Sequence, residues 1–290
     1  MALSVLNNIA AMYAENNLNQ TQSSLQNTLT QLSSGSRINS GSDDAAGLAV
    51  ADGLQANEAA LTQSSQNASS GVSLLQTADG ALSQVNNLLN RAVTLATESA
   101  NGTLNSTQVS AANQEYQNIL TEINNIGSTT NFNSDAVFSA TATNIVVSDG
   151  TSSGTSTFAD TVGALTTATI GETAPATGTT PAAGADLTAA GVATLTAATA
   201  QTVLTTVTAA IGDVAYQRGV IGADVNQLNA AENVASAESE NLTSASSSVL
   251  STDYGAATTN MAKFQVLSQT GISALAQANS VQQEVLKLLQ

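Results

Sequence analysis

The run LTQSSQNASSGVSLLQTADGALSQVNNLLNRAVTLA, residues 61–96, carries an apolar residue at every seventh position without a break. This heptad series consists of Leu61, Ala68, Leu75, Leu82, Leu89 and Ala96. A second apolar series lies three residues further along and consists of Ala78, Val85 and Ala92. Two apolar positions per heptad form the seam of a coiled coil. The stretch therefore predicts a long helical rod over residues 59–99.

The last third of the chain repeats this pattern. Its heptad series consists of Val214, Ile221, Leu228, Ala235, Leu242 and Val249. A further helix is predicted over about residues 105–127, where large apolar residues recur at helical spacing. Residues 1–137 and 200–290 contain no proline, which suits long helices. The predicted fold is mainly α, with long antiparallel helical rods in a coiled-coil-like bundle.

The middle of the chain has a different composition. Residues 144–158, NIVVSDGTSSGTSTF, combine a β-branched run with an Asp-Gly turn signal and predict a small β-hairpin region. Residues 171–191 are rich in Thr, Ala, Gly and Pro. We expect them to form an exposed loop and not a second core.

A turn-rich stretch, LSSGSRINSGSDDAAG, precedes the rod at residues 32–47. It lacks the ligand spacing of a calcium loop and the lysine of a phosphate loop. We interpret it as a joint between two helices, in which Gly35 ends the first helix and Ser42 caps the second. Asp43 and Asp44 would then lie in the first turn of the second helix and complement its dipole. Arg37 is the candidate for fixing the joint against a neighbour.

The two chain ends resemble each other. Residues 3–33 and 256–289 are amphipathic and too poor in bulky residues to form independent cores. We expect them to stay loose until they pair with each other or with the equivalent ends of neighbouring subunits.

The composition excludes several kinds of function. The chain has no His and no Cys, so we expect no enzyme activity, no catalytic residues, no metal site and no cofactor. Five basic residues against 21 acidic ones give a net charge of −16, which argues against nucleic-acid and membrane partners. No basic signal-peptide region precedes Arg37, so secretion would need another route.

Two long stretches resemble bacterial flagellin, the subunit of the flagellar filament. They are LSSGSRINSGSDDAAGLAVAD, residues 32–52, and STDYGAATTNMAKFQVLSQTGISALAQANSVQQEVLKLL near the C-terminus. The resemblance implies an inner core from residues 1–42 and 253–290. The apolar residues of this core would carry polymerisation, and those predicted to do so are Leu3, Leu6, Ile9, Leu275, Val285 and Leu289. The resemblance also implies a rod domain from residues 43–200, with the hairpin and a short variable loop, and a returning rod helix over residues 201–252.

The same resemblance implies the function and the partners. The chain would polymerise with itself into an extracellular filament that gives motility, after type III export through the flagellar apparatus and assembly with the cap and hook-junction proteins. Alternatives are a hook-filament junction protein and an adhesin-type homologue acting through the middle segment. The residues Arg91, Leu95 and Glu115 match the surface by which the host receptor TLR5 detects some flagellins. Alternatively, Arg91 contacts a neighbouring subunit and Leu95 is a packing residue.

Overall fold

The computed structural model describes residues 8–139, 141–148, 155–160, 162–171 and 184–288. The helices are α1 (Ile9–Ser34), α2 (Ala45–Ala100), α3 (Ser106–Thr129), α4 (Ala200–Leu250) and α5 (Tyr254–Leu288). The strands are β1 (Asn131–Phe132), β2 (Asp135–Ala136), β3 (Thr143–Ser148) and β4 (Thr155–Asp160). The chain forms two compact units, one from Met1–Ala56 with Asn241–Gln290 and the other from Asn57–Glu240. The predicted class, mainly helical with small strand pairs, is confirmed.

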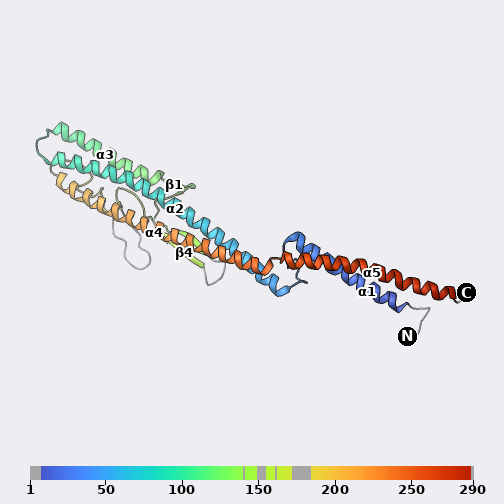
Figure 1. Cartoon of the computed structure of the whole chain (residues 1–290). Helices are drawn as coiled ribbons and strands as arrows, with labels where there is room; N and C mark the ends of the chain where they lie inside the picture. Colours follow the sequence, from blue (N-terminus) through green and yellow to red (C-terminus); the bar gives the residue numbers. More distant parts are fainter. Residues whose placement is uncertain (1–7, 140, 149–154, 161, 172–183, 289–290) are drawn as a thin grey trace. The chain divides into compact units, whose positions relative to one another are not determined.

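In the unit formed by Asn57–Glu240, three helical segments from α2, α3 and α4 run side by side (Figure 1). Every residue of the first heptad series is buried, and five of the six have no exposed surface. In the second heptad series, Val214, Ile221 and Leu228 of α4 are also buried. The heptad pattern therefore predicted the core of this unit correctly, because residues seven apart return to the same helix face.

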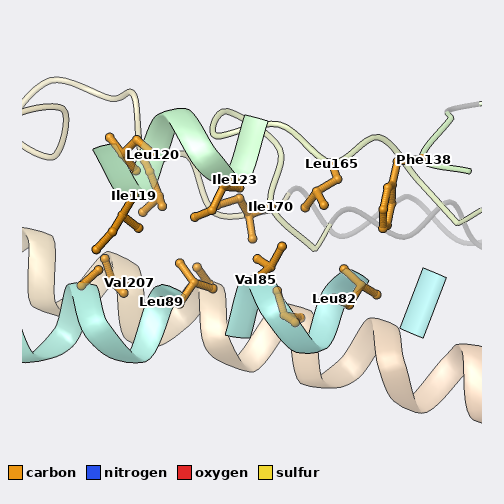
Figure 2. Close-up of a cluster of buried hydrophobic side chains, with 14 of the residues drawn as sticks. Leu82, Val85, Leu89, Ile119, Leu120, Ile123, Phe138, Leu165, Ile170 and Val207 are labelled. Atoms are coloured by element: carbon orange, nitrogen blue, oxygen red, sulfur yellow. The ribbon is translucent and has the colours of Figure 1, made fainter. Parts of the chain in front are cut away.

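The third helix closes this core. Tyr116 and Ile123 of α3 have no exposed surface and belong to the same apolar cluster as α2 and α4. Figure 2 shows Ile119 and Ile123 of α3 directed toward Leu89 and Val85 of α2. A capping box lies at Asn105, whose side chain accepts from the Gln108 N–H at 2.9 Å. This cap fixes the start of α3.

The predicted hairpin exists as the antiparallel pair β3–β4, in which Ile145 faces Phe158. Its turn, including the Asp-Gly pair, lies outside the described residues. Ser64 of α2 holds one edge of β3, since its hydroxyl donates to the Ser148 carbonyl at 2.6 Å and accepts the Ser148 N–H at 2.7 Å. The side chain of Asn67 donates to the Val146 carbonyl at 3.0 Å. Side chains of α2 thus replace a third strand at this edge.

The expectation for residues 171–191 was wrong for the part that the structure describes; residues 172–183 lie outside it. Leu187 is fully buried in the core of the unit, and so are Ile170 and Leu195 on either side of the predicted loop, at 0–1% exposure. The backbones of Ile170 and Ala185 pair in an antiparallel bridge. These large residues are widely separated in a background of Ala and Thr, so they create no periodic signal.

The unit formed by the chain ends contains the pair α1–α5. The two helices lie antiparallel, with the start of α1 and the end of α5 at the same end of the pair (Figure 1). Asn8, the N-cap of α1, donates its side-chain N–H to the Ala278 carbonyl at 3.0 Å. The predicted pairing of the terminal helices is therefore confirmed.

Candidate functional site

The joint begins at Gly35, which ends α1 as predicted. Its φ of 72° is left-handed, and its N–H donates to the Gln31 carbonyl at 2.9 Å. A Cβ at this position would lie 2.8 Å from the hydroxyl oxygen of Tyr254. Both the dihedral angle and the space therefore favour glycine.

The turn that follows α1 is hydrogen-bonded to the turn between α4 and α5. Ser36 and Ser251 form an antiparallel bridge, and the Thr252 N–H donates to the Gly35 carbonyl at 3.1 Å. On the other side of the bridge, the Arg37 N–H donates to the Leu250 carbonyl at 2.6 Å. These bonds join the end of α1 to the end of α4 across more than 200 residues of sequence.

Arg37 fixes the joint within its own chain. Its guanidinium Nη2 donates to the Val249 carbonyl at 2.9 Å, and its carbonyl accepts from Gln31 Nε2 at 3.0 Å. The last carbonyls of α4 lack partners within the helix, and a cation at a helix C-terminus opposes the negative end of the dipole. From the sequence, Arg37 was expected to contact a neighbouring molecule. In the structure its guanidinium contacts the end of α4 in the same chain.

The cap of α2 lies two residues later than predicted. The Asp44 carboxylate, and not the Ser42 hydroxyl, accepts the N–H of Gly47 at 2.9 Å, and α2 begins at Ala45. Ser42 instead shares a hydrogen bond with the Ser40 hydroxyl at 2.7 Å. A carboxylate at the N-cap satisfies an unpaired amide and complements the dipole, so Asp44 outcompetes the serine.

Asp43 stabilises the turn before the helix and does not lie in the first helical turn. Its Oδ2 accepts the N–H groups of Asn39 at 3.1 Å and Ser40 at 2.9 Å. The bond from Asn39, followed by those from Ser40, lowers the pKa of Asp43 below its usual value. The turn is therefore tied together by an ionised carboxylate.

Sequence reasoning missed the corresponding cap of α5. The Asp253 carboxylate accepts the N–H groups of Gly255 at 2.9 Å and Ala256 at 3.0 Å. The signal was present, because Asp253 comes directly before the first residue of α5. An aspartate side chain thus caps the N-terminus of each helix that follows the joint, Asp44 for α2 and Asp253 for α5.

The α1–α5 pair leaves most of its apolar residues uncovered. In α1 the one buried residue is Thr28. Large apolar side chains that are 43–69% exposed are Ile9, Met12, Tyr13, Leu29, Tyr254, Val266, Leu267, Ile272 and Val281. A shallow groove of about 550 Å³ runs between the helices and is lined by Leu18 and Phe264 among others. The pair therefore presents apolar surface that another protein surface could cover.

The structure describes the side chains of only two of the six residues predicted to carry polymerisation, Ile9 and Leu275. Ile9 is the first residue of α1 and is 58% exposed, and Leu275 of α5 is partly buried. Val285 lies in the last turns of α5, but its side chain is outside the described part of the structure. Leu3, Leu6 and Leu289 also lie outside it.

The three residues that match the TLR5-facing surface of some flagellins have different environments in the rod. Arg91 of α2 and Glu115 of α3 form a bidentate pair at 2.6 and 3.0 Å, with side chains 53% and 44% exposed. The hydrogen bond from Arg91 lowers the pKa of Glu115. Leu95 is 2% exposed and packs in the core, which agrees with the alternative assignment of Leu95 as a packing residue.

The described residues contain no group of three or more acidic side chains placed to hold a metal ion. Among the helices described, none has the length and the apolar composition needed to cross a bilayer.

Family models match both ends of the chain. The model for the bacterial flagellin N-terminal helical region matches residues 5–143, and the model for the C-terminal helical region matches residues 204–289. The chain belongs to the bacterial flagellins. Flagellins are a family of structural proteins, and the joint and the terminal pair lie within the two matched regions. The region between the matches holds the β3–β4 hairpin and the buried residues around Leu187.

Curated flagellins are similar to about half of this chain. Flagellin 1 of Proteus mirabilis is 40% identical over 151 residues, which are 52% of this chain and 41% of that protein. Phase 1 flagellin of Salmonella naestved is 42% identical over 139 residues, 48% of this chain and 28% of that protein. The chain thus matches less than half the length of these flagellins. A crystal structure of Bacillus cereus flagellin shares 30% identity, covering 58% of this chain and 88% of that one, with a TM-score of 0.43.

Proposed function

We propose that the chain is the structural subunit of an extracellular bacterial flagellar filament and serves motility. Its membership of the flagellin family supports this function. The observation that carries it is the α1–α5 pair, whose large apolar side chains remain exposed in the subunit. Complete burial of such a side chain contributes about 1.5–3 kcal/mol, and roughly half of this remains to be gained when neighbouring subunits cover the pair.

In this proposal the inner core comprises residues 1–42 and 253–290. Contacts between different surfaces of successive subunits generate an open helical polymer. The chain is secreted, and its partners are the export apparatus, the cap and the hook-junction proteins. Where a host receptor such as TLR5 meets the rod, the accessible groups are Arg91 and Glu115, which are already paired with each other.

Seeded elongation, followed by electron microscopy, tests the proposal. The double variant Val266→Ser with Ile272→Ser removes two exposed apolar side chains of α5, which are 62% and 49% exposed in the subunit. We expect this variant to remain a folded monomer and to elongate at least tenfold more slowly than the unchanged protein, because it loses apolar contact area in the polymer.

The matched control is Gln265→Ser with Gln269→Ser, which alters two exposed polar residues of the same helix. It should elongate normally. Wild-type protein that never elongates from seeds would contradict the filament function. Assembly that stops at short rings would indicate a hook-filament junction protein instead.

A further inference from the structure

The turn that joins α2 to α3 contains the chain's single Asn-Gly pair, Asn101–Gly102. Helix α2 ends at Ala100, and α3 begins at Ser106. Between them, Asn101, Gly102 and Thr103 are all exposed. The pair places the amide carbon of the Asn101 side chain next to the backbone nitrogen of the following residue. Bond formation between these two atoms closes a five-membered ring.

The local structure leaves the Gly102 nitrogen accessible. Among the described residues its N–H has no hydrogen-bond acceptor, whereas the Asn101 N–H donates to the Glu98 carbonyl at 3.2 Å. Gly102 has a left-handed φ of 66°, and the space around its Cα is open. Because glycine has no Cβ, its nitrogen can approach the preceding side chain without a steric clash. The turn therefore meets the steric conditions for ring closure.

Two asparagines that precede a serine show the contrast. The Asn105 side chain caps α3, where its Oδ1 accepts the Gln108 N–H at 2.9 Å. Asn39 lies in the joint, and the N–H of the following Ser40 donates to Asp43 Oδ2 at 2.9 Å. In the first case the electrophile is engaged by a hydrogen bond, and in the second case the nucleophile is. Asn101 and Gly102 combine a free nucleophile with exposure and the absence of a Cβ.

We propose that Asn101 is a site of spontaneous deamidation in the folded protein. The Gly102 nitrogen loses its proton to solvent and attacks Cγ of Asn101. As the N–Cγ bond forms, the Cγ–Nδ2 bond breaks, and Nδ2 takes a proton from water and leaves as ammonia. Water then opens the resulting succinimide. Attack at Cγ gives aspartate, and attack at the main-chain carbonyl carbon gives isoaspartate, whose backbone runs through Cβ and Cγ.

Either product places a carboxylate at the C-terminal end of α2. The last carbonyls of a helix form the negative end of its dipole, so a negative charge added there is unfavourable. Glu98 lies three residues earlier and adds repulsion between like charges. Isoaspartate also lengthens the backbone between α2 and α3 by a methylene group. Deamidation therefore loosens the last turn of α2. The inference concerns the monomer and does not depend on filament assembly.

Incubation of the full-length monomer in mildly alkaline buffer, followed by digestion with a glutamate-specific protease, tests the proposal. Cleavage after Glu98 and Glu115 releases residues 99–115, which contain Asn101, Asn105 and Asn113. Tandem mass spectrometry then follows the deamidation of all three asparagines in one peptide. Digestion at acidic pH suppresses further reaction during the work-up.

Asn105 and Asn113 are internal controls, because each accepts a backbone N–H, from Gln108 at 2.9 Å and from Leu195 at 2.7 Å. In the folded monomer we expect Asn101 to react at least tenfold faster than either. Denaturant should accelerate the two controls more than Asn101, whose turn is already open. The proposal is overturned if Asn101 reacts no faster than the controls in the folded monomer, or if denaturant accelerates all three equally.

The variant Gly102→Ala tests the route, since its Cβ hinders ring closure and should slow deamidation of Asn101 at least tenfold. Gly80→Ala is the matched control: an added Cβ at Gly80 of α2 also meets open space, and the turn is unchanged, so Asn101 should react as in the unchanged protein. Protein isoaspartyl methyltransferase should detect isoaspartate, because direct hydrolysis of the amide yields aspartate alone. An unaltered rate in Gly102→Ala, or deamidation without isoaspartate, would refute attack by the Gly102 nitrogen.

Discussion

Helices α1 and α3 have similar lengths, 26 and 24 residues, but they bury very different numbers of side chains. In α1 one residue is buried, the polar Thr28, whereas α3 buries six, including Tyr116 and Ile123. The rod unit therefore completes its core within one subunit. The terminal pair leaves most of its large apolar residues exposed. Under the proposed function, the same kind of helix serves folding in one unit and association between subunits in the other.

The largest expected effect contrasts a leucine in each region. Leu89→Ala removes a side chain with no exposed surface, and should lower the free energy of unfolding by about 2–5 kcal/mol. Leu267→Ala alters a leucine that is 43% exposed in α5 and should cost the monomer less than about 1 kcal/mol. Denaturant unfolding followed by circular dichroism measures both. Equal losses would break the comparison between the regions.

The second prediction concerns the joint, where Gly35→Ala combines backbone strain with a clash against Tyr254. We expect a loss of about 2–3 kcal/mol in the unit that contains the chain ends. Gly102→Ala provides the control, because Gly102 has a similar φ of 66° but open space around it. It should cost only about 1 kcal/mol. Adding Tyr254→Phe to Gly35→Ala should recover part of the difference; no recovery would exclude the clash as its cause.

A third, smaller effect is expected at the cap of α2. Asp44→Ala leaves the Gly47 N–H without its side-chain acceptor and should cost about 1 kcal/mol. Asp52→Ala removes an exposed carboxylate two turns further along the same helix and should be nearly neutral. Thermal unfolding measures both variants. If Asp44→Ala left the stability unchanged, Ser42 and not Asp44 would be the residue that caps α2.

The smallest effect should appear only in acid. The pKa of Asp43 is lowered in the folded protein, so its ionised form contributes stability above the usual pKa of 3.8. This contribution is lost as the pH falls through the lowered folded value. Asp43→Asn should therefore lose less stability than the unchanged protein between pH 5 and the acid limit of folding. Asp52→Asn serves as the control and should follow the unchanged protein, and a parallel Asp43→Asn curve would refute the role of the charge.

The sequence predicted the long helices and their seams because heptad spacing depends only on local geometry. Leu75, Leu82 and Leu89 are buried as that spacing required. The end of α1 was also predictable, since glycine is favoured in a left-handed cap. The position of the α2 cap was missed by two residues, because Ser42, Asp43 and Asp44 are all favourable cap residues.

Long-range partners could not be predicted from sequence spacing. Arg37 contacts Val249, and Leu195 contacts Asn113, yet no local pattern links the members of either pair. Leu187 was expected in a loop because its surroundings are rich in Ala and Thr. It is buried in the apolar cluster of the rod unit and its N–H bonds to the Thr167 carbonyl, and no local pattern in the sequence indicates these distant partners.

The hydrogen bonds of the joint also affect its resistance to proteolysis. Trypsin cleaves after Lys and Arg, of which the chain has five, and Arg37 lies in an exposed turn. A protease must draw several residues of its substrate into an extended strand, but both backbone groups of Arg37 are already engaged by Leu250 and Gln31. Cleavage there requires the bridge between Ser36 and Ser251 to open first, so Arg37 is a poor trypsin site although its side chain is exposed.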